Sequence, residues 1–229
     1  MSRRPLVKIC GLTRREDLRK ARELGADFFG SIGVPDTPRY QPLPVAARLF
    51  AEATDPRQRV RVFFEPTPAE ARAALEAGFA KVQAHWDPAG SYDPQALSAA
   101  IGTAHLWLAP RLPDPLAFRP EWLPLGERFL IDGYRPDRIG GTGVPVDTEA
   151  FRALQERYPD ARFALAGGLT PDNVERVLRE SQAAFLDLSS GVESSPGHKD
   201  PTRLAALFAA LPPARPAFRG ESPGEGPRS

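Results

Sequence analysis

Two side chains that could transfer protons stand where predicted strands end. Cys10 closes an apolar run interrupted by Lys8, and Asp132 closes the apolar run 128–131. A thiolate is an effective proton acceptor when nearby positive charge or backbone amides lower the pKa of the thiol, and a carboxyl group with a raised pKa is an effective acid. Together they predict acid–base chemistry. The alternatives are a small buried apolar residue for Cys10 and a cap of the following glycine-rich loop for Asp132.

Two glycine-bearing segments have the composition of anion-binding loops. Gly167 and Gly168 follow one predicted strand, and Ser190 and Gly191 follow the next. Glycine lets the backbone approach an anion closely, and the N-terminus of a following helix supplies partial positive charge. The pair predicts a phosphate site, although a tight turn into the helix expected at Pro171 would also explain the first segment.

Arg39 and His85 are the remaining candidates from position alone. Arg39 lies in a loop after the second predicted strand, where a guanidinium could pair with a carboxylate, and His85 ends the fourth. A solvated surface arginine and a structural histidine are the alternatives. No set of His, Cys, Asp or Glu has metal-ligand spacing, so we expect no metal.

Eight short apolar runs alternate with amphipathic segments, which is the pattern of a parallel sheet covered by helices. Eight such units favour a closed (β/α)8 TIM barrel over a doubly wound open sheet. Catalytic groups of such barrels lie at the C-terminal ends of strands. The predicted strands are Pro5–Cys10, Asp27–Ile32, Arg59–Phe64, Lys81–His85, Ala104–Ala109, Arg128–Asp132, Arg162–Ala166 and Ala183–Leu188.

The predicted helices follow these strands, several with proline in the first turn. Thr13 is a candidate cap of the first helix. The fifth segment, Pro110–Leu125, is crowded with prolines and is expected to be short or irregular. The predicted helices are Arg14–Leu24, Pro44–Ala53, Pro68–Ala77, Pro94–Ile101, Asp147–Tyr158, Pro171–Arg179 and Asp200–Leu211.

Composition bounds the class of protein. The 229 residues suit one domain over residues 1–211, and the Pro-, Gly-, Arg- and Ser-rich residues 212–229 are expected to form a disordered tail. A net charge of +1 and the lack of a long apolar run argue against nucleic-acid and membrane partners. A single cysteine and the absence of a signal-peptide core indicate a cytoplasmic protein.

An ordered set of motifs over about residues 6–211 resembles phosphoribosylanthranilate isomerase of tryptophan biosynthesis. The motifs are KICGLT (8–13), PRY (38–40), QAH (83–85), LID (130–132), GGTG (140–143), AGGLTPDN (166–173) and SSGVESSPGHK (189–199). The resemblance implies a (β/α)8-barrel enzyme that uses no cofactor and catalyses an Amadori rearrangement of a small phosphorylated substrate, N-(5-phosphoribosyl)anthranilate, to 1-(2-carboxyphenylamino)-1-deoxyribulose 5-phosphate.

The resemblance also implies roles for individual residues. Asp132 would protonate the furanose oxygen, Cys10 would remove the C2′ proton, and Arg39 would hold the anthranilate carboxylate. His85 and Asp187 would complete the pocket, and the two glycine loops would hold the phosphate. Either a monomer or a homodimer is compatible with this sequence.

Several positions depart from the family pattern. Strand two carries Ser31 and Gly33 in place of large residues, and Trp86 replaces a glycine after His85. We therefore hypothesise that Trp86 fills volume vacated near Gly33. Two lysines usual in the family are also replaced, by Leu108 at the end of strand five and by Val144 after the GGTG segment.

These departures keep two alternatives open. One is a related barrel isomerase that acts on another ribosyl phosphate, with Arg39 serving a different group. The other is a non-catalytic barrel that only binds phosphorylated ligands. The presence of both Cys10 and Asp132 favours an enzyme.

Overall fold

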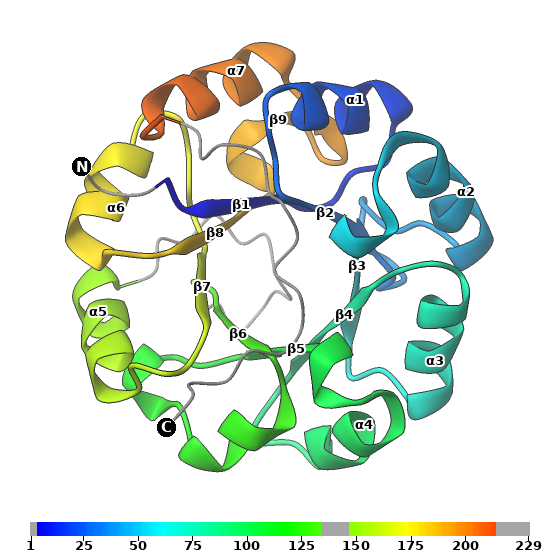
Figure 1. Ribbon diagram of the computed structural model, residues 1–229, viewed down its shortest axis with the longest axis vertical. Coiled ribbons are helices and arrows are strands. Elements are labelled where there is room, and N and C mark those ends of the chain that lie inside the picture. The colour runs from blue at the N-terminus through cyan, green and yellow to red at the C-terminus, as the bar shows by residue number, and fades with distance from the viewer. Residues whose placement is uncertain (1–3, 134–146, 214–229) are drawn as a thin grey trace, which may run out of the picture.

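The computed structural model describes residues 4–133 and 147–213, which form a closed barrel of eight parallel strands. Helices surround the barrel as an outer ring (Figure 1). Each strand pairs with the next along the chain, and β1 closes the sheet by pairing with β8, where Lys8 lies opposite Asp187. The predicted (β/α)8 barrel is therefore confirmed, and the open sheet is excluded.

The eight strands lie within a few residues of their predicted bounds. Short apolar and β-branched runs form them because both faces of a closed parallel sheet are buried. The strands are β1 (Leu6–Ile9), β2 (Phe28–Ile32), β3 (Arg59–Phe64), β4 (Lys81–Trp86), β5 (Leu106–Pro110), β6 (Arg128–Ile131), β7 (Phe163–Ala166) and β8 (Phe185–Leu188).

Local signals start many of the helices. Thr67 and Glu70 form a reciprocal capping box at α3, and the side chains of Asp147 and Asp200 accept backbone N–H groups at the starts of α5 and α7. The helices are α1 (Arg15–Glu23), α2 (Leu43–Ala53), α3 (Pro68–Glu76), α4 (Pro94–Ile101), α5 (Thr148–Arg157), α6 (Val174–Ser181) and α7 (Pro201–Ala210).

Two predicted helix starts are wrong. Thr13 does not cap α1; its hydroxyl donates to the carbonyl of Gly197, and Arg14 takes the cap position without a side-chain bond. The sixth helix begins at Val174 instead of Pro171, because Asn173 first closes a turn with its side-chain oxygen on the N–H of Thr170.

The proline-rich segment after β5 is irregular, as predicted. It forms two short 3-10 helices, η3 (Pro115–Ala117) and η4 (Pro120–Leu125). Three other 3-10 turns are η1 (Pro56–Gln58), η2 (Thr103–His105) and η5 (Ser190–Val192), and η5 leads into a hairpin of β9 (Glu193–Ser195) and β10 (His198–Lys199).

Alternate residues of each strand face the inside of the barrel. Near the N-terminal ends of the strands, the rings of Phe28, Trp107 and Phe185 pack with centroids 5.0–5.5 Å apart. The guanidinium of Arg128 lies 4.1 Å from the centroid of the Phe185 ring. We call this group the lower aromatic layer; it fills the barrel interior near the N-terminal ends of the strands.

The hypothesis about Trp86 is wrong, because that residue faces the outer layer of the protein. Its ring packs edge-on against Trp122 of η4 at 5.3 Å, within the core between strands and helices. His85 faces the barrel interior, so its neighbour in an extended strand must point to the opposite face. Leu108 also belongs to the outer core and does not line the pocket.

The space beside Gly33 is filled from the neighbouring strand β3. A Cβ atom on Gly33 would lie 2.8 Å from both the Nε of Arg61 and the ring of Phe63. The buried Arg61 donates 2.6 Å bonds to the hydroxyl of Ser31 and the carbonyl of Gln41. The small residues Ser31 and Gly33 thus accommodate the Arg61 side chain.

Within the described residues, no helix is long and apolar enough to cross a membrane. Residues 214–229, most of the predicted tail, lie outside the described part of the chain, as do Val144 and the GGTG segment at 140–143. The division into a domain of residues 1–211 and a disordered tail stays a prediction.

Candidate active site

One pocket at the C-terminal ends of the barrel strands collects all the predicted site residues. It opens where such barrels carry their catalytic groups. The nine residues are Cys10, Arg39, His85, Asp132, Gly167, Gly168, Asp187, Ser190 and Gly191.

A buried ion pair forms one wall of this pocket. The Nζ of Lys8 donates to Oδ2 of Asp187 at 2.7 Å, and the Lys8 side chain is fully buried. Burial alone would lower the pKa of Lys8, but the Asp187 carboxylate and Cys10 raise it above its ordinary value. Gly30 leaves space for the side chains of Lys8 and Cys10, since a Cβ there would lie 2.9 Å from the Sγ of Cys10 and 3.0 Å from the Cε of Lys8. A permanent positive charge therefore lies close to the thiol.

The environment of Cys10 differs from the one expected of a low-pKa thiolate. Burial raises the pKa of the thiol above its usual range and outweighs Lys8 and Lys199, which lower it; Asp187 raises it further. Cys10 is thus a thiol in the free protein at neutral pH. The two lysines are placed to stabilise its thiolate once it forms.

Asp132 has the environment of a general acid. Burial, and then the charge of Asp187, raise its pKa to about 7, while a backbone hydrogen bond from Gly133 and the charge of Lys8 oppose the rise. A large fraction of the molecules therefore carries a protonated Asp132 at neutral pH.

His85 is neutral in this pocket. Burial, with the charges of Lys8 and Arg111, lowers its pKa to about 3. The Nε2 of Gln83 lies 2.8 Å from the Nε2 of His85, so in this orientation the amide donates and the ring proton sits on Nδ1.

Two oxygen acceptors are buried beside the pocket without a hydrogen-bond partner among the described residues. They are Oδ1 of Asp187 and Oε1 of Gln83, and both residues line the pocket. Buried acceptors are costly when unsatisfied. A ligand rich in hydroxyl groups would satisfy them.

The two glycine loops meet at the rim. Gly167 and Gly168 have φ values of 98° and 60°, which favour glycine. Asn173 holds this first loop through a 2.8 Å bond to the carbonyl of Gly168. A Cβ on Gly191 would lie 1.9 Å from the carbonyl oxygen of Leu169, so the second loop packs directly on the first. The contact brings the two loops together at the pocket that both of them line.

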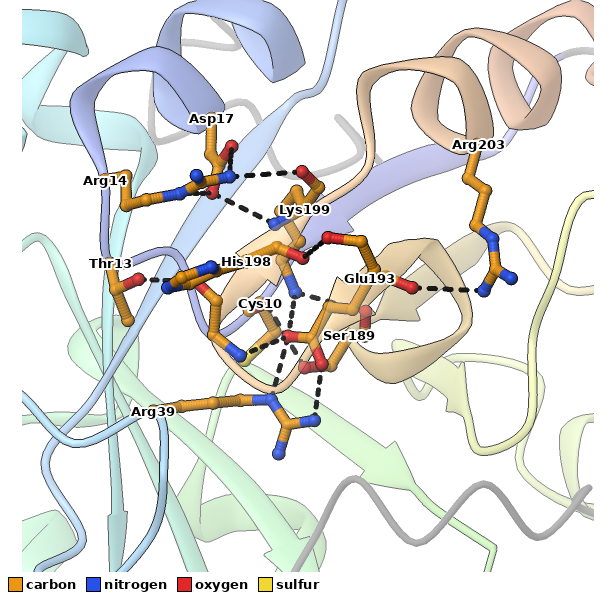
Figure 2. Close-up of polar contacts among 12 residues, drawn as sticks. Cys10, Thr13, Arg14, Asp17, Arg39, Ser189, Glu193, His198, Lys199 and Arg203 are labelled. Atoms are coloured by element: carbon orange, nitrogen blue, oxygen red, sulfur yellow. Dashed lines mark hydrogen bonds and ion pairs between the residues drawn. The ribbon is translucent and has the colours of Figure 1, made fainter.

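Arg39 reaches the pocket but is held by a glutamate that sequence reasoning had not singled out. Its Nε and Nη2 donate to Oε1 and Oε2 of Glu193 at 2.9 and 2.6 Å. The Nζ of Lys199 donates to the same Glu193 at 2.8 Å (Figure 2). The surface-arginine alternative is therefore excluded, since only 13% of the Arg39 side chain is exposed.

Four polar residues of this region stand in the motifs quoted above but were given no role from the sequence: Lys8, Gln83, Glu193 and Lys199. The alternation of a strand offered a signal for two of them, because Lys8 shares an inward face with Cys10, and Gln83 with His85. Glu193 and Lys199 follow the last strand in a loop whose folding no local period predicts. Within the described residues, no group of three or more His, Cys, Asp or Glu could hold a metal ion.

Comparisons with known proteins agree on one family. The family model described as N-(5′-phosphoribosyl)anthranilate (PRA) isomerase matches residues 7–210. An N-(5′-phosphoribosyl)anthranilate isomerase of a Synechococcus species is 36% identical over 210 residues, which are 90% of this chain and 95% of the relative.

Solved structures give the same result. The phosphoribosyl anthranilate isomerase of Thermus thermophilus superposes with a TM-score of 0.76 at 35% identity and covers 90% of this chain and 97% of its own. A second isomerase structure, in complex with reduced 1-(o-carboxyphenylamino)-1-deoxyribulose 5-phosphate, shares the fold with a TM-score of 0.72 at 24% identity, over 90% of this chain and 97% of its own. The match over almost the whole barrel shows that this chain belongs to the phosphoribosylanthranilate isomerase family.

Proposed function

We propose that this protein carries out its family's isomerisation, the conversion of N-(5-phosphoribosyl)anthranilate to 1-(2-carboxyphenylamino)-1-deoxyribulose 5-phosphate, with Asp132 as general acid and Cys10 as general base. The observation that carries this assignment is the pocket shared by a carboxyl group with a pKa near 7 and a thiol flanked by lysines. No cofactor enters the proposal.

Asp132 acts first. Its proton goes to the ring oxygen of the furanose, the bond from C1′ to that oxygen breaks, and the nitrogen lone pair forms an iminium with C1′. The raised pKa of Asp132 suits this step, because a general acid is most effective when its pKa lies near the working pH.

Cys10 acts second. In the form that carries the proton on Asp132 and holds Cys10 as a thiolate, Cys10 removes the proton from C2′, whose acidity the adjacent iminium increases. The electron pair moves through C1′ to the nitrogen to give an enolamine. Tautomerisation then moves a proton from the C2′ hydroxyl to C1′ and leaves the ketone. Lys8 and Lys199 stabilise the thiolate electrostatically during this step.

Substrate binding uses the remaining residues of the pocket. The backbones of Gly167, Gly168, Ser190 and Gly191 bind the phosphate, as glycine-rich loops after the last two strands do in many barrels. The unpartnered Oδ1 of Asp187 accepts a sugar hydroxyl. Arg39 binds the anthranilate carboxylate, and His85 closes the pocket as a neutral donor through Nδ1.

A steady-state assay tests the function. Phosphoribosylanthranilate generated from anthranilate and ribose 5-phosphate is added to the wild type, and the loss of its fluorescence is followed. Turnover supports the proposal, whereas binding of phosphorylated ligands without turnover would favour the non-catalytic barrel. Turnover of another ribosyl phosphate alone would favour the related isomerase.

Three further expectations stay predictions. The protein works in the cytoplasm, binds neither nucleic acid nor membranes, and is a monomer or a homodimer. A dimeric isomerase of this family is known from Thermotoga maritima. Sedimentation of the purified protein separates the two oligomeric states.

A further inference from the structure

Glu193 is the centre of a polar network beside the candidate active site. Its carboxylate accepts bonds from Arg39, from the Nζ of Lys199 at 2.8 Å and from the backbone N–H of Gly197 at 3.3 Å. Only 4% of its side chain is exposed, and the Lys199 side chain is fully buried. Figure 2 shows Arg39 and Lys199 reaching Glu193 from different directions.

The geometry of the pair leaves one edge of the Arg39 guanidinium for a ligand. Glu193 takes the side-on edge, formed by Nε and Nη2. A guanidinium carries five N–H donors in a planar fork, so the end-on edge, with one N–H of Nη1 and one of Nη2, is not used by Glu193. That edge fits a second carboxylate bidentately.

The Arg39 side chain is also fixed along its aliphatic part. A Cβ on Gly11 would lie 2.6 Å from the Cδ of Arg39, and Gly11 has a φ of 71°. Gly11 directly follows Cys10, so Arg39 crosses the backbone next to the thiol. With its stem on Gly11 and one edge on Glu193, the guanidinium has little freedom to turn.

The net charge of the network favours binding of one anion. Arg39 and Lys199 carry one positive charge each and Glu193 one negative charge, so the three side chains sum to +1. An arginine–glutamate pair alone would be neutral overall, and the nearby Glu193 charge would weaken the attraction of Arg39 for a second carboxylate. Lys199 offsets the Glu193 charge and lets Arg39 accept one.

The same network reaches the phosphate loop. Glu193 directly follows η5 (Ser190–Val192), and Lys199 also donates to the carbonyl of Ser189 at 3.1 Å. The hairpin that carries Lys199 is anchored to α1, because Asp17 accepts the Lys199 N–H at 3.0 Å and is bound in turn by Arg14 (Figure 2). Residues 189–199 therefore connect the phosphate loop to the side chains that hold Arg39.

We propose that Glu193 is a positioning residue that orients Arg39 for the aryl carboxylate of the substrate, and that Lys199 supplies the charge that makes this second carboxylate acceptable. This inference rests on the proposed function and deepens it. It assigns recognition of the carboxylate to a unit of three side chains, Arg39, Glu193 and Lys199.

The test compares two substrates in the wild type and in Glu193→Gln. One is phosphoribosylanthranilate; the other is phosphoribosylaniline, made from aniline and ribose 5-phosphate, which lacks only the carboxylate. A glutamine has one acceptor oxygen where Glu193 uses two, and its NH2 group faces a guanidinium N–H, so the bidentate pair is lost and with it the orientation of Arg39. We expect kcat/KM for the carboxylate substrate to fall about 10- to 100-fold, mainly through KM, and that for the aniline substrate to stay near the wild-type value.

A matched control is Glu127→Gln. Glu127 is another partly buried carboxylate that bridges cations, Lys81 and Arg162, near the N-terminal ends of the strands. This control costs stability but leaves the preference between the two substrates unchanged. A merely structural role of Glu193 predicts that its variant behaves like the control, with equal losses on both substrates, and that result would overturn the proposal.

A double-mutant cycle with Arg39→Lys tests whether Glu193 acts through Arg39. If it does, Glu193→Gln has little further effect on kcat/KM once Arg39 is lysine; a full additional loss would contradict the proposal. If Glu193→Gln folds poorly, Glu193→Asp, which keeps the charge but shortens the reach, should show the same loss of preference. A wild type that turns over neither substrate would overturn the proposed function itself, whereas a wild type that turns over both equally well would overturn only this inference.

Discussion

The lower and upper halves of the barrel interior are built from the same strands but differ in chemistry. On β8, Phe185 belongs to the lower aromatic layer, and Asp187, two residues later, lines the pocket. On β6, Arg128 stacks on the Phe185 ring, while Asp132 directly follows the strand at the mouth. In the described part of the chain, the lower layer consists mainly of packed rings, with the Nε of Arg128 left without a hydrogen-bond partner, whereas the upper layer keeps buried oxygen acceptors without partners and a carboxyl group with a raised pKa.

The residues that stabilise the barrel and the residues that could carry its function therefore lie at opposite ends of the barrel axis. A close-packed aromatic layer gains free energy from burial. The upper layer holds charged groups out of water, which costs free energy unless they are paired. The barrel tolerates that cost at one end because the other end and the outer core supply the stabilisation. Substitutions at the upper end should therefore lower activity more than stability, and substitutions at the lower end should lower stability more than activity.

The largest expected effect is on catalysis at the upper end. Asp132→Asn removes the proton donor, so kcat/KM for phosphoribosylanthranilate should fall by about 10²- to 10⁴-fold. The stability should not fall. The folded-state pKa of Asp132 is raised to about 7, so ionisation destabilises the native state as the pH rises through that value, and the amide removes this penalty.

Turnover assays and urea unfolding at pH 8 check both statements. Cys10→Ser is the companion variant and should lose activity to a similar extent without unfolding. A near-normal rate for Asp132→Asn would remove Asp132 from the acid role.

At the lower end, the effect should be on stability instead. Phe185→Ala removes a fully buried ring from the aromatic layer and should lower the free energy of unfolding by about 3–5 kcal/mol. At a temperature where the variant is folded, KM and kcat should stay close to the wild type. Urea denaturation and assays at low temperature measure both quantities. An unchanged stability with a large loss of kcat would break the comparison between the two ends.

A smaller loss is expected at the phosphate loops. Gly191→Ala places a Cβ atom 1.9 Å from the carbonyl oxygen of Leu169, so the two loops must separate. We expect KM to rise by roughly tenfold or more, since misplaced binding groups cost affinity steeply, while kcat changes less. The control is Gly90→Ala in the exposed turn after β4, which should leave KM unchanged. Equal KM values for the two variants would argue against phosphate binding by these loops.

The smallest effect is a shift of the pH profile. The wild-type kcat/KM should rise through about pH 7, where Asp132 titrates, and fall only where Cys10 titrates above its usual range. Between these two limits Asp132 and Cys10 together hold one proton. In the productive form this proton is on Asp132, and Cys10 is a thiolate. Because the charge of Asp187 raises the pKa of Asp132, Asp187→Asn should move the acidic limb to lower pH.

Rate profiles of the wild type and Asp187→Asn over this range measure that shift. Its own stability cost, from leaving Lys8 buried without its partner, is followed separately by unfolding. An acidic limb that moves to higher pH would contradict the conclusion that the Asp187 charge raises the pKa of Asp132.

Local pattern was sufficient for the strands, for most helices and for the strand ends that carry Cys10, His85 and Asp132. These features depend on residues close in the chain, through alternation, capping and proline placement. Eight repeated units then determine the closure, and closure brings the strand ends to one mouth. All nine proposed site residues line that mouth for this reason.

Only the tertiary structure decided how those side chains are paired and what their proton affinities are. Glu193 meets Arg39 across 154 residues of sequence, and Lys8 meets Asp187 across 179. Such pairs form when the barrel closes, and burial then moves the pKa values of Cys10 and Asp132. The sequence by itself determined the fold and the family's set of residues; the direction of Trp86, the filling beside Gly33 and the Glu193 network depended on long-range packing that no local period encodes.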